Sequence, residues 1–306
     1  KFGYNNEKFL EFLNKNEFYM PDKTFSTFGS TPDELNLILN MDYPIRSGWV
    51  SDAYQDLKTN KVMSTFSDQN YSVIETNSAM RWKDFSDVDT HLCYDVDFIN
   101  SEFLDQVLRK SIIRYFMEQH QTDTRRDIVR CTFNELSEIA LQSNGPTYVF
   151  AHLYVPHPPF IFGPNGENVT PDHSEISGLQ SWENPQGYLN QLIYATSEIS
   201  VVITNIVEND PNAIIILQGD TGTFTGIYDL SKGSMKDVYQ AHSILYAVRM
   251  PDVNNFENAI PVNTYRIIFN NYFDMNYEYL EHRIYMANEN DELKNVTKTI
   301  YEYRFG

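Results

Sequence analysis

Two short apolar runs, each followed at once by polar residues, constrain the fold of this chain more than any other feature. The first run covers residues 148–155 and ends at the Pro- and His-containing segment 156–160, and the second covers 213–217 and ends at segment 218–222. Short, nearly continuous apolar runs bounded by Gly and Pro are typical of strands buried on both faces of a parallel sheet. Ligands of open α/β sheets bind just outside the carboxyl ends of such strands. We therefore expect the polar residues after the two runs to line one site.

Further strands and helices alternate along the chain. We expect strands at 71–74, 148–155, 213–217 and 243–248, and helices near 9–13, 31–39, 54–66, 103–116, 128–141, 185–207 and 264–273. This alternation predicts a doubly wound α/β fold, in which helices sandwich a mostly parallel sheet. Right-handed crossovers would set the loops after the strands along one edge of that sheet. We interpret residues 1–306 as one domain with a helical elaboration at 76–125.

The acidic composition excludes some classes of partner. The formal net charge is −19 and the pI is about 4.6, with the acidic residues spread along the sequence. Nucleic acids and anionic membrane surfaces both attract clustered Lys and Arg, so we expect neither as a partner. No apolar run approaches the roughly 20 residues that a membrane-spanning helix needs. We interpret the acidity as a solvated surface.

The cysteines and glycosylation sequons leave the compartment open. Cys93 and Cys131 either pair or remain as two buried free thiols, and their spacing matches no Cys-based zinc pattern. Sequons begin at Asn70, Asn168 and Asn295, and they matter only in a secretory setting. Because the chain is rich in Asn, this number of sequons is close to chance.

The sequence Thr31-Pro32-Asp33-Glu34 predicts the start of a helix. Thr31 at the N-cap, Pro32 at the first helical position and Glu34 at the third form a capping box. A hydroxyl at a helix N-terminus also suits phosphoryl or sulfuryl transfer, since the helix dipole favours an anion and the hydroxyl can attack it. Thr31 is therefore either a helix cap or a nucleophile, and the residues alone leave both open.

Three residues near the expected strand ends have the same double interpretation. Asp220 follows the second run and is either a turn residue or a ligand for a metal that would neutralise charge on the transferred group. His157 lies between two prolines and is either a rigid loop residue or a substrate contact. His152 lies inside the first predicted strand, where strand alternation directs it toward either the core or the site.

Segments 151–160 and 215–222 resemble the sulfatase-like branch of the alkaline phosphatase superfamily. The nearest form is the extracytoplasmic domain of membrane-anchored sulfatase-like proteins, with more distant similarity to lipoteichoic acid synthase and phosphoethanolamine transferases. Segments 28–43 and 261–270 resemble the family's nucleophile region and a late segment, so the resemblance covers nearly the whole chain. It implies an extracytoplasmic protein, membrane-associated or at the cell surface, that acts on phosphate or sulfate esters of surface glycans or lipids.

Carried over to this sequence, the resemblance implies a role for each candidate residue. Thr31 would be the nucleophile, with Ser30 as the alternative. Asp220 would be a metal ligand, with Thr221 beside it. His157 would contact the anionic group of the substrate or its leaving group, and His152 is a second candidate for substrate binding. The bound metal would be a divalent ion: Mn²⁺, Zn²⁺, Mg²⁺ or Ca²⁺.

Two departures from the family pattern bear on that metal site. The family has Asp-His-Gly where this chain has Asp220-Thr221-Gly222, and a Thr oxygen suits Mg²⁺ or Ca²⁺ better than a transition metal. The family's first strand ends in an acidic metal ligand, and we expect it just before Lys1. An upstream segment would supply that strand and could also carry a membrane anchor or bind an envelope partner.

Three functions therefore remain open from the sequence. The first is metal-dependent hydrolysis or transfer of phosphate or sulfate esters. The second is a catalytically degenerate relative, with or without a metal, that keeps the fold to bind an anionic surface group or a partner. The third is a structural component of the cell envelope. The fold cannot separate them, because function depends on the site.

Overall fold

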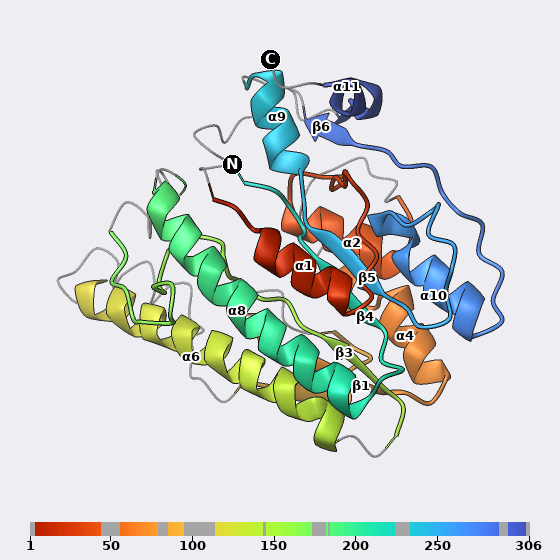
Figure 1. Cartoon of the computed structure of the whole chain (residues 1–306), viewed down its shortest axis with the longest axis horizontal. Helices are drawn as coiled ribbons and strands as arrows, with labels where there is room; N and C mark the ends of the chain where they lie inside the picture. The colour runs from red at the N-terminus through yellow and green to blue at the C-terminus, as the bar shows by residue number, and fades with distance from the viewer. Residues whose placement is uncertain are drawn as a thin grey trace. The chain divides into compact units, whose positions relative to one another are not determined.

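The computed structural model of the chain (Figure 1) describes residues 4–43, 56–78, 85–94, 114–142, 145–172, 182, 184–223, 233–287 and 293–303. The chain divides into two compact units, and each is described by itself. The first comprises Lys1–Asn6, Tyr71–Lys83 and Val88–Asp210, and the second Glu7–Asn70, Asp84–Asp87 and Pro211–Gly306. The prediction that residues 1–306 form one domain with a helical elaboration at 76–125 stays a prediction. A division into compact units does not decide how many domains the chain has.

The first unit contains a three-stranded parallel sheet in the order β2–β1–β3. The central strand β1 (Ser72–Thr76) pairs with β2 (Thr90–Leu92) on one side and with β3 (Thr147–Phe150) on the other. Ile74 takes part in both pairings, opposite Thr90 in β2 and opposite Val149 in β3. The parallel sheet and the helices that alternate with its strands confirm the predicted α/β class.

Two long helices of the same unit, α6 (Arg114–Gln142) and α8 (Pro185–Asn209), pack against each other (Figure 1). Helix α8 begins at the predicted proline, and the side chain of Asn184 caps it by accepting a backbone amide. Helix α6 includes the predicted helix 128–141 and begins well before it. The predicted helix 103–116 falls mostly outside the described residues.

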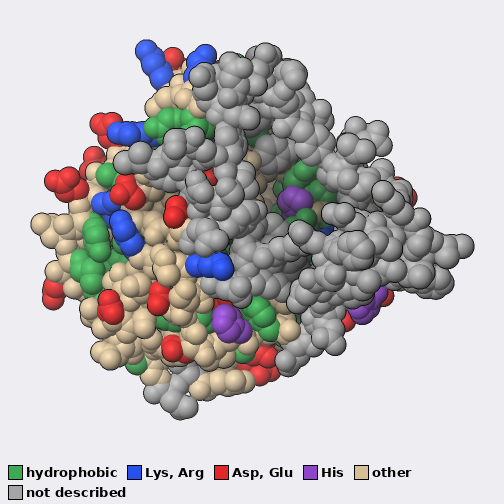
Figure 2. All heavy atoms as spheres, turned by 180° about the vertical axis from the view of Figure 1, so that it is seen from behind, with side chains coloured by type: hydrophobic (Ala, Val, Ile, Leu, Met, Phe, Trp, Pro, Cys, Tyr) green, Lys and Arg blue, Asp and Glu red, His purple; other side chains and the backbone are tan. Residues whose placement is uncertain are grey.

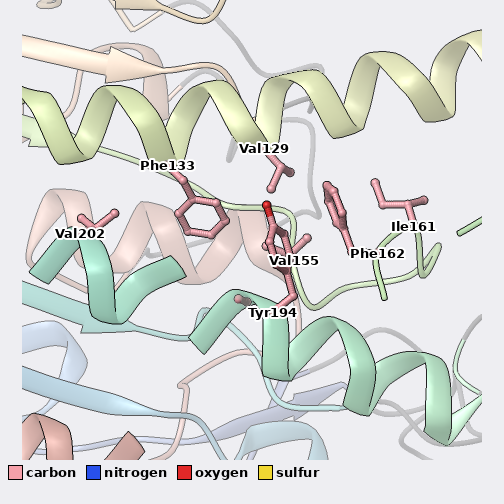
Figure 3. Close-up of a cluster of buried hydrophobic side chains, with 8 residues drawn as sticks. Val129, Phe133, Val155, Ile161, Phe162, Tyr194 and Val202 are labelled. Atoms are coloured by element: carbon pink, nitrogen blue, oxygen red, sulfur yellow. The ribbon is translucent and has the colours of Figure 1, made fainter. Parts of the chain in front are cut away.

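Apolar side chains of α6, of α8 and of the segment after β3 form one core cluster (Figure 3). Its buried members are Val129, Phe133, Val155, Ile161, Phe162, Tyr194, Ala195 and Val202. The rings of Phe162 and Tyr194 lie 4.6 Å apart between centroids. Burial of this apolar surface fixes the course of the segment after β3, which carries His152 and His157.

The predicted strand 148–155 is too long, because β3 ends at Phe150. His152 therefore follows the strand and does not lie inside it. The segment beyond contains prolines, which lack the amide donor that a sheet requires. The amide of His157 donates to the carbonyl of Tyr154 at 3.0 Å, so the chain turns there.

A disulfide joins Cys93, just after β2, to Cys131 in α6. The sequence left pairing and free thiols open, and the structure shows the pair. The bond closes a loop across 38 positions of sequence within the first unit. A cross-link of this kind stabilises a fold chiefly by restricting the unfolded chain.

The second unit contains the remaining elements. They are α1 (Glu7–Lys15), α2 (Thr31–Asn40), α4 (Lys61–Asp68), β4 (Ile215–Gln218), α9 (Met235–His242), β5 (Tyr246–Arg249), η2 (Pro261–Asn263), α10 (Thr264–Tyr272), β6 (Tyr285–Ala287), β7 (Leu293–Asn295) and α11 (Thr297–Glu302). The expected strands 213–217 and 243–248 correspond to β4 and β5, but these two strands pair antiparallel. The last three elements form the acidic, Tyr-rich tail that the sequence pattern left unassigned.

The described surface carries no continuous basic region on the face that Figure 2 shows, where Lys and Arg side chains are scattered among Asp and Glu. The exclusion of a nucleic-acid backbone as partner stays a prediction from the acidic composition. Within the described residues, no helix has the length and apolar character that crossing a membrane requires.

Candidate functional site

Thr31 is the first residue of α2, and the helix N-cap is Ser30. The predicted capping box is therefore wrong by one position. Ser30 has extended backbone angles, φ −134° and ψ 134°, but its hydroxyl donates to the carboxylate of Asp33 and caps no backbone amide. Since Ser and Thr are both favoured N-caps, the sequence could not decide which of the two neighbours begins the helix.

The hydroxyl of Thr31 donates a hydrogen bond to the Oδ2 atom of Asp220. The other oxygen of this carboxylate, Oδ1, accepts the backbone amide of Thr221 at 2.8 Å. The structure thus brings together two predicted site residues that lie far apart in the sequence. A hydroxyl nucleophile beside a carboxylate, at the N-terminus of a helix, is an arrangement that can bind and attack an anionic ester.

The loop that carries Asp220 is held in place by backbone hydrogen bonds on both sides of it. The amide of Gly219 donates to the carbonyl of Leu245 at 2.9 Å, and the amide of Gly222 donates to the carbonyl of Ala241 at 2.7 Å. A Cβ atom at Gly222 would lie 2.1 Å from the backbone oxygen of Gln240. Only a residue without a side chain allows this loop to approach the end of α9 so closely.

The segment that leads into Thr31 is fixed by the chain on either side of it. The amide of Ser26 donates to the carbonyl of His242 at 2.8 Å. The carbonyl of Thr27 accepts the amide of Tyr285, also at 2.8 Å. Ser26 and Thr27 therefore lie between the end of α9 and β6, and the chain bends over residues 27–30 before the helix begins.

Glu34 is a site residue whose role the sequence pattern does not reveal, because the pattern predicts only a capping-box position for it. Its side chain is fully buried, and its Oε2 atom accepts the amide of Phe28 at 2.8 Å. Burial raises the pKa of Glu34 well above its usual value, and the neighbouring carboxylates of Asp220 and Asp33 raise it further. The hydrogen bond from the Phe28 amide acts in the opposite direction. The surroundings of Glu34 therefore favour its uncharged form.

The two predicted histidines belong to the first unit, whereas Thr31 and Asp220 belong to the second. The Nδ1 atom of His157 lies 2.6 Å from the carbonyl oxygen of Pro158, to which it donates. The His157 ring packs against Tyr154 and Trp182, with centroid distances of 4.6 and 5.2 Å. Substrate contacts by His152 and His157 stay predictions.

The donors beside Thr31 do not form a closed metal site within the described residues. No group of three or more His, Cys, Asp and Glu side chains in the described ranges is placed to hold a metal ion. Both oxygens of Asp220 already accept hydrogen bonds, from Thr31 and Thr221. Thr221 offers a hydroxyl where an imidazole would suit a transition metal. We therefore assign no chemical step to a metal.

Comparison with known proteins gives structural neighbours only. No protein-family model matches the chain, and no curated protein matches its sequence. The C-terminal periplasmic domain of EptC from Escherichia coli, solved in complex with zinc, matches with a TM-score of 0.59 and 12% identity, over 100% of this chain and 89% of that one. The C-terminal periplasmic domain of phosphoethanolamine transferase EptC from Campylobacter jejuni matches with a TM-score of 0.55 and 13% identity, over 91% and 85%.

A third structure, the lipoteichoic acid synthase LtaP from Listeria monocytogenes, matches with a TM-score of 0.46 and 15% identity, over 81% of this chain and 60% of that one. This similarity is too low to carry an argument. Identities of 12% and 13% for the two EptC domains establish a shared fold and no more. The chain shares its α/β fold with these two periplasmic EptC domains.

Proposed function

We propose that this chain is an extracytoplasmic sulfatase-like domain that transfers or hydrolyses phosphate or sulfate esters of surface glycans or lipids, with Thr31 as its nucleophile. The observation that carries the proposal is the hydrogen bond from the Thr31 hydroxyl to Asp220 at the N-terminus of α2. One structural neighbour is a phosphoethanolamine transferase, which favours phosphate over sulfate as the transferred group.

The chemistry follows from the position of these two side chains. The substrate's anionic group binds at the N-terminus of α2, where the helix dipole favours negative charge. The Oγ1 atom of Thr31 attacks phosphorus, and its proton passes to Asp220. The ester bond to the leaving group breaks, and the departing oxygen takes that proton back from Asp220. Proton transfer of this kind contributes about 10²–10⁴-fold to the rate.

The second half of the reaction releases the phosphoryl group from Thr31. Water or an acceptor hydroxyl attacks phosphorus, gives its proton to Asp220, and the Thr31 oxygen recovers a proton as it leaves. Water gives hydrolysis and an acceptor hydroxyl gives transfer. His157 and His152 would bind the anionic group or the leaving group in this scheme.

Two observations support an extracytoplasmic location, membrane-associated or at the cell surface. The disulfide between Cys93 and Cys131 is a type of bond that persists in oxidising compartments. The two EptC neighbours are periplasmic domains. The sequons at Asn70, Asn168 and Asn295 begin at exposed residues, which glycosylation would require in a secretory setting.

A catalytically degenerate domain is the second candidate function. It is favoured by Thr221, which replaces the imidazole of the family pattern, and by the hydrogen bonds that occupy both oxygens of Asp220. In this case the N-terminus of α2 would hold an anionic surface group, or a partner that carries one, without turnover. The domain would then serve as a binding or structural component of the cell envelope.

Turnover of ester substrates distinguishes the two candidates. The purified chain is incubated with p-nitrophenyl phosphate, p-nitrophenyl sulfate and vesicles that contain phosphatidylethanolamine, each with and without Zn²⁺, Mn²⁺ or Ca²⁺. Thr31→Ala should abolish any activity, whereas Thr65→Ala on α4 is the matched control and should keep it. Equal activity of Thr31→Ala and the parent chain would reject Thr31 as the nucleophile.

A further inference from the structure

Glu34 is an unusual first-turn carboxylate, because its side chain is fully buried. Carboxylates in the first turn of a helix are commonly solvated and favoured by the helix dipole. Burial of a carboxyl group is costly unless it is hydrogen-bonded and either paired with a cation or uncharged. Among the described residues, the ionisable groups that interact with Glu34 are the acidic Asp220, Asp33 and Tyr43. The surroundings of Glu34 therefore favour the uncharged carboxyl.

The side chain of Glu34 turns back from the helix onto the chain that precedes Thr31. Its Oε2 atom accepts the amide of Phe28 at 2.8 Å, and this hydrogen bond is buried. The amide of Glu34 itself donates to the carbonyl of Ser30 at 3.0 Å. Glu34 thus makes two hydrogen bonds to the turn before Thr31, one through its side chain and one through its backbone amide.

This contact lies at the end of a series of anchors along the incoming segment. Ser26 and Thr27 are held by backbone hydrogen bonds to His242 and Tyr285. The ring of Phe28 stacks on Tyr285 with 5.9 Å between centroids. The hydrogen bond to Glu34 follows as the next anchor, three residues before Thr31. The position of the Thr31 hydroxyl relative to Asp220 therefore depends on it.

We propose that Glu34 is a positioning residue, whose carboxyl oxygen holds the Phe28–Ser30 turn so that Thr31 faces Asp220. The role depends on an accepting oxygen and not on a negative charge. The expected effect of Glu34 on the rate of the reaction rests on the proposed function. Its expected effect on the conformation of the turn rests on the hydrogen bond to the Phe28 amide alone. The two effects can be measured separately.

Two substitutions distinguish the hydrogen-bond role of the Glu34 side chain from its role in packing. Glu34→Gln keeps a carbonyl oxygen in an uncharged side chain of the same length. Glu34→Met keeps the length and packs well in an apolar site, but it offers no comparable acceptor. Glu11→Gln and Glu11→Met on the exposed side of α1 are the matched controls.

Hydrogen exchange of the Phe28 amide, followed by NMR in the intact chain, tests the effect on the turn. We expect exchange in Glu34→Met to be faster by about tenfold or more, because the buried amide loses its acceptor. Exchange in Glu34→Gln should stay within about twofold of the parent chain. Slow exchange in Glu34→Met, or fast exchange in Glu34→Gln, overturns the proposal. If Glu34→Met does not fold, Glu34→Gln decides alone.

Turnover provides the second readout. We expect Glu34→Met to lower kcat by about tenfold or more with little change in KM, and Glu34→Gln to restore nearly the full kcat. Equal loss in both variants would mean that the charge itself is required, which contradicts the proposal. If the parent chain turns over no ester, the proposed function fails, and the exchange of the Phe28 amide still decides whether Glu34 positions the turn.

Discussion

Thr31 and Asp220 share a hydrogen bond although 189 positions separate them in the sequence. Thr31 begins α2, and Asp220 lies just after β4. Each is held by its own set of backbone contacts within the second unit, so the pair exists before any ligand binds. Preorganised groups of this kind lose little free energy to rearrangement when a substrate arrives.

Gly222 should tolerate no side chain, because the loop that carries Asp220 packs tightly against the end of α9. A Cβ atom there would lie 2.1 Å from the Gln240 carbonyl oxygen and 2.7 Å from that of Ser243. We expect Gly222→Ala to lower the free energy of unfolding by about 2 kcal/mol or more. Urea denaturation measures the change. Gly145→Ala is the control, since nothing lies within 4 Å of a Cβ atom at that position; an equal loss in both variants would contradict the account.

Acid should destabilise the second unit through two histidines, the buried His242 and the half-buried His282. Burial lowers the pKa of His242 and that of His282 to about 4, from a usual value near 6.5. The unfolded chain therefore binds protons that the folded chain excludes, and stability is lost as the pH falls from about 6.5 toward 4. Glu34 acts in the opposite direction, since its raised pKa favours the folded state at low pH.

The contribution of His242 can be isolated by comparing Tm against pH in the parent chain and in His242→Gln. We expect the parent to lose more Tm than the variant between about pH 6.5 and pH 4. The control is His120→Gln on α6, because His120 is exposed and has no role in the proposed site. Parallel curves for the parent chain and His242→Gln would show that His242 does not titrate across this range.

The metal preference of the site should change when an imidazole replaces the hydroxyl of Thr221. Asp220 and Thr31 offer only oxygen donors, whereas Zn²⁺ favours imidazole nitrogen. We expect calorimetric titration with Zn²⁺ to give tighter binding in Thr221→His than in the parent chain. The added affinity should vanish in Asp220→Ala/Thr221→His. No change in Thr221→His would mean that this side chain does not face Asp220's site.

Reduction of the disulfide should weaken the first unit. The Cys93–Cys131 bond spans 38 positions, and a loop of this size typically stabilises a fold by about 2–4 kcal/mol. We expect dithiothreitol to lower the urea midpoint of the parent chain. The double variant Cys93→Ser/Cys131→Ser should already have the lower midpoint and should not respond to the reductant. An equal response of both proteins would show that the effect is not due to this bond.

The sequence predicted the strongest local patterns well. The α/β class followed from short apolar runs that alternate with helices, and Pro185 correctly marked the start of α8. The prediction that Asp220 and Thr31 belong to one site combined an Asp at a strand end with a hydroxyl at a helix start, and the two side chains share a hydrogen bond. These features were predictable because periodicity and proline position act locally.

Other features depend on tertiary contacts that a single sequence does not reveal. The predicted helix start is wrong by one residue because Ser30 and Thr31 have similar capping preferences. The hydroxyl of Thr31 donates a hydrogen bond to Asp220, a contact that the local sequence does not reveal. Two further features join segments that are distant in the sequence. These are the antiparallel pairing of β4 with β5 and the Cys93–Cys131 disulfide. Glu34 was interpreted as a capping residue because its burial depends on chain segments far from it in the sequence.

Covalent labelling of Thr31 tests the central claim most directly. The chain is mixed with p-nitrophenyl phosphate, quenched in acid within the first turnovers and digested, and the peptide that contains Thr31 is analysed by mass spectrometry. The account predicts a phosphoryl adduct on Thr31 that is absent from Thr31→Ala and present in the control Thr65→Ala. Turnover of the ester without an adduct on Thr31, or with an adduct on Ser30, would contradict it.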